Sequence, residues 1–289
     1  MIDEQGDPGE RGLRKPVMIV AFEGWNDAGD AATNAIEQLT AGWESTPLVE
    51  IDPEDYYDFQ VSRPNTRMVD GVTRLVEWPT TRVSTVRLPA EISDRDVILV
   101  RGIEPNFHWR AFCEELLTVA DTHQVSDVIC LGALLADVPH TRPVQVTGTA
   151  PDPASAERFG VAQSSYEGPT GITGIFADAC VQRGIPAFTF WAAVPHYVAH
   201  GPHPKATVAL LNRVEEVLNI VLPLGNLPTQ AVEWEVEVND VAAQDEDITA
   251  YIQTLEESAE DEVPLRPASG DSIAAEFERY LRRHGPQPD

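Results

Sequence analysis

Polar side chains that could bind a ligand or catalyse a reaction crowd a turn near the start of the chain. An apolar run over residues 17–22 leads into a turn that contains Glu23, Asn26 and Asp27, and alanines at helical spacing follow. This order is typical of a buried strand, a tight turn and the start of a helix. Open α/β folds bind ligands or partners in such turns, at the carboxyl ends of parallel strands. The alternative is structural, because Asp27 or Asp30 could simply cap the helix.

Further polar residues stand where predicted strands end or where a helix begins. They are Arg101, Glu104, His140, Arg142 and His196 after strands, and Tyr166 and Glu167 before a helix. Convergent Glu, Arg and His side chains at one sheet edge are what a small-molecule site requires. His140 could act as a base, and Arg142 could bind a carboxylate or a phosphate. The alternative is that His140 clamps its own loop through hydrogen bonds.

Established catalytic and metal-binding motifs do not account for these residues. His196, His200 and His203 fall within eight positions, but they lack an acidic ligand at a fixed spacing. No Gly-x-Ser-x-Gly elbow is present, and the glycines match neither a dinucleotide-binding fingerprint nor a P-loop. We therefore predict no catalytic residue, no metal and no cofactor.

The spacing of apolar runs predicts the scaffold that positions these residues. Strands are predicted at residues 17–22, 48–51, 96–103, 125–133, 144–149 and 187–193, and helices at residues 27–41, 109–120, 171–182 and 207–222. Alternating strands and helices indicate an α/β fold, a mostly parallel sheet with helices on both faces. Hairpin-like runs at residues 68–78 and 85–88 suggest antiparallel additions.

Composition restricts the class of protein. The 289 residues are 43% hydrophobic, enough for one large domain with an appendage. The formal charge of −27 argues against binding nucleic acid or an anionic membrane. Residues 1–16 are predicted to be disordered and show no signal peptide, so we expect a cytoplasmic protein. Cys113, Cys130 and Cys180 are expected to be reduced core residues.

The C-terminal part differs in charge and pattern from the predicted α/β domain at residues 17–222. Residues 223–289 hold 16 acidic and 4 basic side chains, which predicts an acidic helical extension. Ile248, Ile252 and Leu255 repeat on one helical face and require a surface to pack on. Residues 231–241 fit both a strand and a helix, and we favour a helix. A last helix is predicted at residues 271–283.

Four separated segments together indicate a family. They are residues 20–32, 139–143, 166–172 and 191–198, and they make the chain resemble the proteasome assembly chaperone family in its bacterial and archaeal form. The resemblance implies a fold similar to purine nucleoside phosphorylases, self-association and a role in assembling the proteasome core. The last five residues, Gly-Pro-Gln-Pro-Asp, depart from the hydrophobic-Tyr-x tail with which some members dock on the proteasome.

Two functions follow from these observations. The first is a non-enzymatic interaction or assembly protein that forms a homo-oligomer, most simply a trimer, with proteasome subunits as further partners. The alternative is a small-ligand-binding protein or a phosphorylase-like or ligase-like enzyme, with a pocket at the carboxyl ends of the strands. Fold alone does not decide between these two functions. Both predict that five residues converge on one face of the sheet, namely Glu23, Asn26, Arg101, Arg142 and Glu167.

Overall fold

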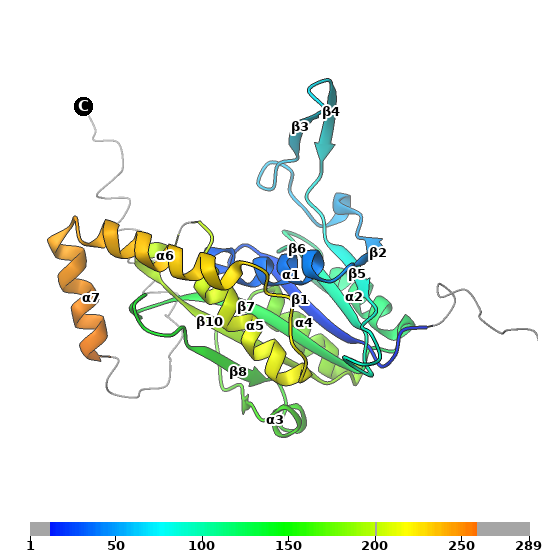
Figure 1. The fold of residues 1–289 in the computed structure, drawn as a ribbon. Coiled ribbons are helices and arrows are strands. Elements are labelled where there is room, and N and C mark those ends of the chain that lie inside the picture. Colours follow the sequence, from blue (N-terminus) through cyan, green and yellow to red (C-terminus); the bar gives the residue numbers. More distant parts are fainter. Residues whose placement is uncertain (1–11, 200, 259–289) are drawn as a thin grey trace, which may run out of the picture.

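An eight-stranded mixed sheet forms the centre of the computed structural model, which describes residues 12–199 and 201–258 (Figure 1). Its order is β2-β5-β6-β1-β7-β10-β8-β9. The bounds are β1 Val17–Glu23, β2 Thr46–Glu50, β5 Arg82–Val86, β6 Val97–Ile103, β7 Asp127–Ala136, β8 Val146–Ala150, β9 Ala162–Gln163 and β10 Ala187–Pro195. The four central strands β6, β1, β7 and β10 are parallel to one another. Their carboxyl ends therefore meet at one edge of the sheet.

Helices cover both faces of this sheet, as the sequence predicts. Helices α1 Ala31–Gly42 and α5 Pro204–Leu218 cover one face, and α2 Trp109–Thr122 and α4 Ile172–Arg183 cover the other. The other described helices are α3 Pro153–Phe159, α6 Leu227–Ala242 and α7 Glu246–Ser258. In β1, Ile19 packs with the core under α1 and α5, whereas its neighbour Val20 packs with the core under α2 and α4. Both faces of the strand are buried, which explains its continuous apolar sequence. The predicted α/β class is confirmed.

The two edges of the sheet depart from the parallel pattern. On one side β5 pairs antiparallel with β6, and β2 pairs antiparallel with β5. The hairpin-like run predicted at residues 85–88 overlaps β5, whereas the run at residues 68–78 belongs to a separate two-stranded hairpin. On the other side β8 pairs antiparallel with β10, an orientation that the sequence does not reveal. Helix α3 was not predicted, because seven residues are too few to show a helical apolar period. Its signals are local: Asp152 accepts hydrogen bonds from the amides of Ala154 and Ser155, and Gly160 ends the helix in a left-handed conformation.

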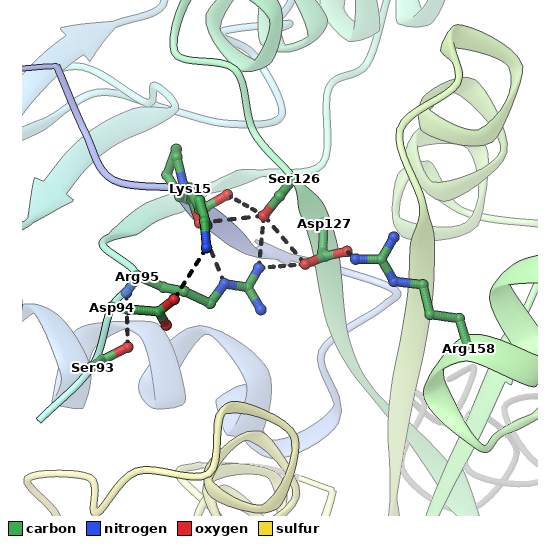
Figure 2. Close-up of polar contacts among 8 residues, drawn as sticks. Lys15, Ser93, Asp94, Arg95, Ser126, Asp127 and Arg158 are labelled. Atoms are coloured by element: carbon green, nitrogen blue, oxygen red, sulfur yellow. Dashed lines mark hydrogen bonds and ion pairs between the residues drawn. The ribbon is translucent and has the colours of Figure 1, made fainter.

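A buried carboxylate locks the amino edge of the sheet, opposite to the predicted site. Asp127, the first residue of β7, forms ion pairs with Arg95 from the β5–β6 connection and with Arg158 from α3 (Figure 2). Ser126 also accepts a hydrogen bond from Arg95 at 2.8 Å. The Asp127 side chain is 3% exposed, so this carboxylate depends on its two arginines for the contacts that water would otherwise supply.

The chain before β1 is also attached to this edge. Arg14 forms an ion pair with the buried Asp96 at 2.6 Å, and its backbone amide donates to the same carboxylate at 2.8 Å. Burial alone would raise the pKa of Asp96, but the hydrogen bonds and the charge of Arg14 outweigh it and lower the pKa. The rest of the segment predicted to be disordered, residues 1–11, lies outside the described residues.

The acidic extension begins with two helices, as the sequence predicts. α6 is a helix although its valines alternate as in a strand, and α7 buries Ile252 and Leu255. The helix predicted at residues 271–283 lies outside the described residues, and the boundary near residue 223 stays a prediction. Cys113, Cys130 and Cys180 are free and buried, as predicted. Among the described helices, none is both long and apolar enough to cross a membrane.

Candidate functional site

At the carboxyl edge, one polar network ties together two loops, strand β7 and the start of helix α4. Glu104 Oε1 accepts hydrogen bonds from Asn26 Nδ2 at 2.8 Å and from the backbone amide of Ile172, the first residue of α4, at 2.9 Å. The carbonyl of Asn26 accepts from the amide of Ala133 in β7 at 2.8 Å. A side chain at Gly171 would place its Cβ 2.0 Å from Asn26 Oδ1, so this position requires glycine. The network fixes how the loops after β1 and β6 sit against α4.

Asp27 caps helix α1 from the same turn. Its carboxylate accepts hydrogen bonds from the amide of Ala32 at 2.6 Å, from the amide of Thr33 at 3.2 Å and from the Thr33 hydroxyl. These amides belong to the first turn of the helix, where no intrahelical acceptor exists. Burial raises the pKa of Asp27 to about 6, although these hydrogen bonds act in the opposite direction.

This pKa predicts a pH dependence that the variant Asp27→Asn should lack. Because the folded-state pKa is raised, the protonated carboxyl stabilises the fold fully below the unfolded pKa near 4, and the contribution is lost as the pH rises through about 6. A rise of this size corresponds to about 3 kcal/mol. Urea unfolding should show that the free energy of unfolding of the wild type falls by this amount, relative to that of the variant, between pH 4 and pH 7. Asp30→Asn, at an exposed carboxylate of the same turn, serves as control, and a constant difference between wild type and Asp27→Asn would contradict the assignment.

A second pair of predicted site residues forms its own cluster. Arg101 forms ion pairs with Glu23 at 3.1 Å and with Glu37 of α1 at 3.6 Å. Burial raises the pKa of Glu23, and the charge of Arg101 opposes this effect. The pair joins the end of β1 to β6, and both side chains are partly exposed.

His140 lies in a third group, beneath the acidic extension. Its Nδ1 is 2.8 Å from the Tyr197 hydroxyl, and its Nε2 is 3.1 Å from Asn239 Oδ1 in α6. Burial lowers the pKa of His140. Lys205 donates to the His140 carbonyl at 2.6 Å and forms an ion pair with Glu235 of α6 at 2.6 Å. This is the arrangement of a clamp between a loop and a helix.

The two other histidines of this region have different partners. The ring of His203 stacks on Trp234 of α6 at 3.9 Å between centroids, and its Nδ1 accepts from the amide of Ala206. Burial lowers the pKa of His203 to about 4, so it is neutral at pH 7. His196 Nδ1 is 3.1 Å from Asp137, and its ring contacts Tyr251 of α7. His200 lies outside the described residues, and no group of three or more His, Cys, Asp or Glu in the described part of the chain could hold a metal ion.

The remaining predicted site residues are exposed. Arg142 lies in the loop after β7, and Tyr166 and Glu167 lie in the loop before α4. The predicted site thus consists of three contact groups and these exposed residues. Glu23 and Arg101 lie near the carboxyl ends of β1 and β6, and the other residues lie in connecting segments outside the central strands. Sequence reasoning missed the contribution of Lys205 and Trp234, because nothing in either local pattern indicates a partner about thirty residues away.

Three exposed aromatic residues lie in the loops that carry or lead to the Asn26–Glu104–Ile172 network. Trp25, Phe107 and Tyr166 are 59%, 49% and 52% exposed, and they come from the loops after β1, after β6 and before α4. The network joins the first two of these loops to each other and to Ile172, where the third loop ends. We call these three residues the aromatic rim. The sequence offers one signal for it: each of these large aromatic residues lies within two positions of a glycine or a proline.

Comparison with known proteins places this geometry in context. The PAC2 family model matches residues 21–242, from β1 to the end of α6. No curated protein matches the chain.

Solved structures with the same fold include close and distant relatives. A PAC2 family protein from Streptomyces avermitilis is 51% identical, with a TM-score of 0.77 over 82% of this chain and 99% of its own. A proteasome-assembly chaperone homologue from Mycobacterium tuberculosis is 58% identical, with a TM-score of 0.74 and the same coverage of both chains. An archaeal proteasome activator from Pyrococcus furiosus is 16% identical, with a TM-score of 0.63 over 79% of this chain and 94% of its own, and shares the fold.

Proposed function

The chain belongs to the PAC2 family, and from this premise we propose that it is a proteasome-assembly chaperone that acts through protein–protein contacts. A relative that is 58% identical carries the description of a proteasome-assembly chaperone homologue. We propose proteasome subunits as its partners, the cytoplasm as its location, and a homo-oligomer, most simply a trimer, as its working form.

The observation that carries this proposal is the aromatic rim. Aromatic side chains are enriched among the residues that contribute most to protein–protein binding. Trp25, Phe107 and Tyr166 expose about half of their surface. Trp25 and Phe107 lie in the two loops that the Asn26–Glu104 hydrogen bond joins, and Tyr166 lies in the loop that leads to Ile172, whose amide donates to the same carboxylate. A surface that is already ordered loses little conformational entropy on binding, which favours association.

The polar residues of the same edge point away from the enzymatic alternative. Asn26, Asp27 and Glu104 use their polar atoms to cap helices and to join loops. A nucleophile or general base needs a free hydrogen-bonding direction toward a substrate. These carboxylates instead support the backbone that presents the aromatic rim.

Alanine at all three rim positions should abolish binding to proteasome subunits. Truncating one such aromatic anchor weakens binding by roughly 2 kcal/mol or more, which is more than tenfold. We expect the triple variant Trp25→Ala, Phe107→Ala and Tyr166→Ala to lose retention of purified proteasome α and β subunits in a pull-down. Its far-UV circular dichroism spectrum should match that of the wild type, because the side chains are exposed.

Ile92→Ala provides a matched control for this experiment. Ile92 is 51% exposed and precedes β6, at the amino edge of the sheet. It should retain the subunits as the wild type does. Wild-type protein that retains neither subunit would refute the proposed function, whereas retention by the triple variant would refute only the role of the rim.

A further inference from the structure

A β-hairpin stands out from the body of the protein. Strands β3 Asn65–Val69 and β4 Thr73–Glu77 form a separate two-stranded sheet, and Figure 1 shows it projecting beyond the main sheet. Met68, Val72 and Val76 are 57%, 82% and 43% exposed. An isolated two-stranded hairpin is only marginally stable in water. A hairpin that exposes this much apolar surface therefore gains stability when a partner covers it.

One face of the hairpin is apolar and positively charged. Thr66 pairs with Val76 and Met68 pairs with Arg74, so these four side chains share a face. That face carries no carboxylate. On the other face Arg67 forms an ion pair with Glu77, which neutralises it.

The charge of this region is opposite to that of the whole chain. Residues 61–82 contain four arginines and two carboxylates, whereas the complete chain has a net charge of −27. A basic and apolar face on an acidic protein is complementary to the remaining surface of that same protein.

The outer side of α6 has the matching composition. Val232 and Val236 are one helical turn apart, and they are 65% and 54% exposed. Glu233 and Glu237 lie beside them and are also exposed. Residues 227–258 contain nine carboxylates and no lysine or arginine.

We propose that the hairpin of one copy docks on the outer side of α6 of a second copy, with Arg74 facing Glu233 and Glu237 and with Met68 and Val76 covering Val232 and Val236. Both surfaces are uncovered within one chain, as their exposure shows. A contact between two different surfaces is heterologous, and it closes into a ring when the rotation allows. The inference rests on the proposed self-association and names the surface that produces it.

Charge reversal on each side, followed by their combination, tests this contact. Arg74→Glu places a carboxylate against the acidic side of α6, and the pair Glu233→Arg and Glu237→Arg repels the hairpin. Light scattering at micromolar concentrations should give oligomer masses for the wild type and lower masses for both variants, with association at least about tenfold weaker. The triple variant with all three changes should regain the wild-type mass. Arg110→Glu, at an exposed arginine on α2, serves as control and should leave the mass unchanged.

Each outcome of this experiment has a defined meaning. Wild-type mass in both reversed variants, or failure of the triple variant to recover, overturns the hairpin–α6 contact and leaves self-association in place. A wild type that stays at 31.7 kDa overturns the proposed self-association together with this contact. If Arg74→Glu keeps its mass but no longer retains proteasome subunits, the hairpin binds those subunits and the inference is wrong.

Discussion

Replacing Ile252 and Leu255 with aspartate is expected to detach α7 from the protein. Both side chains are more than 90% buried. Burial of an aliphatic side chain of this size contributes about 1.5–3 kcal/mol, so the two together account for most of the docking energy of a short helix. A carboxylate cannot be buried there without a partner, so the helix should leave its site. Limited proteolysis should then cleave within residues 243–258, and the apparent melting temperature should fall.

The matched control uses the exposed side of the same helix. Ala250→Asp and Gln253→Asp add the same two charges at exposed positions and should leave the protease pattern unchanged. Deleting residues 224–289 is expected to go further, because it removes Trp234 and Asn239 and uncovers His140 and His203. A truncated protein with unchanged melting and unchanged mass in solution would contradict a packed role for both helices.

The contacts of His140 explain why detachment should affect more than the extension itself. Asn239 is 99 residues away from His140 in sequence, and the two are joined by a hydrogen bond. Thr141 also donates to Glu256 of α7. Loss of the helices removes both hydrogen bonds and exposes the loop to water, so the loop loses contacts that fix its conformation. The extension therefore stabilises the conformation of the loop after β7.

The fold could be predicted from the sequence where a segment is buried on both sides. Strand β1 reads as a continuous apolar run because both cores contact it, and the same holds for the other parallel strands. Strand β8 was predicted at residues 144–149, but its antiparallel orientation was not. Helix α3 was missed because it is short and only partly buried. Residues 231–241 fit two periods, and the helix prevails because Ala231 is buried and Trp234 stacks on His203.

The site could be predicted only as far as its place in the fold. Glu23, Asn26, Arg101 and Glu104 follow from topology, since parallel strands end at one edge. Whether each of them is exposed to a partner or is used in a structural hydrogen bond depends on contacts that no local sequence pattern encodes. Glu104 accepts a hydrogen bond from the amide of Ile172, 68 residues later. This amide has no partner within the helix because it belongs to the first turn. Local sequence could therefore locate the edge but could not separate structural from exposed residues.

The second large effect is expected at the amino edge, from the variant Asp127→Ala. This carboxylate is 3% exposed and forms ion pairs with Arg95, which is 25% exposed, and with Arg158, which is 51% exposed. Its removal separates α3 and the β5–β6 connection from β7, the second of the four central strands counted from β10 (Figure 2). Breaking a buried ion pair costs about 3–5 kcal/mol of folding stability. Because the arginines are partly exposed, we expect Asp127→Ala to cost about 3 kcal/mol, the lower end of this range. Urea unfolding monitored by circular dichroism measures the difference.

Three further variants separate burial from simple loss of charge. Asp127→Asn keeps the size of the side chain and one acceptor, so it should cost less than alanine while still losing both ion pairs. Arg158→Ala should cost under about 1 kcal/mol, because its guanidinium is half exposed and solvent screens the pair. Asp94→Asn breaks an exposed pair with Lys15 in the same neighbourhood and should leave stability within error of the wild type. If Asp127→Ala were no more destabilising than Asp94→Asn, the two arginines would contribute nothing net at this edge. The attachment of α3 would then rest on apolar contacts such as that of Phe159 with Phe188.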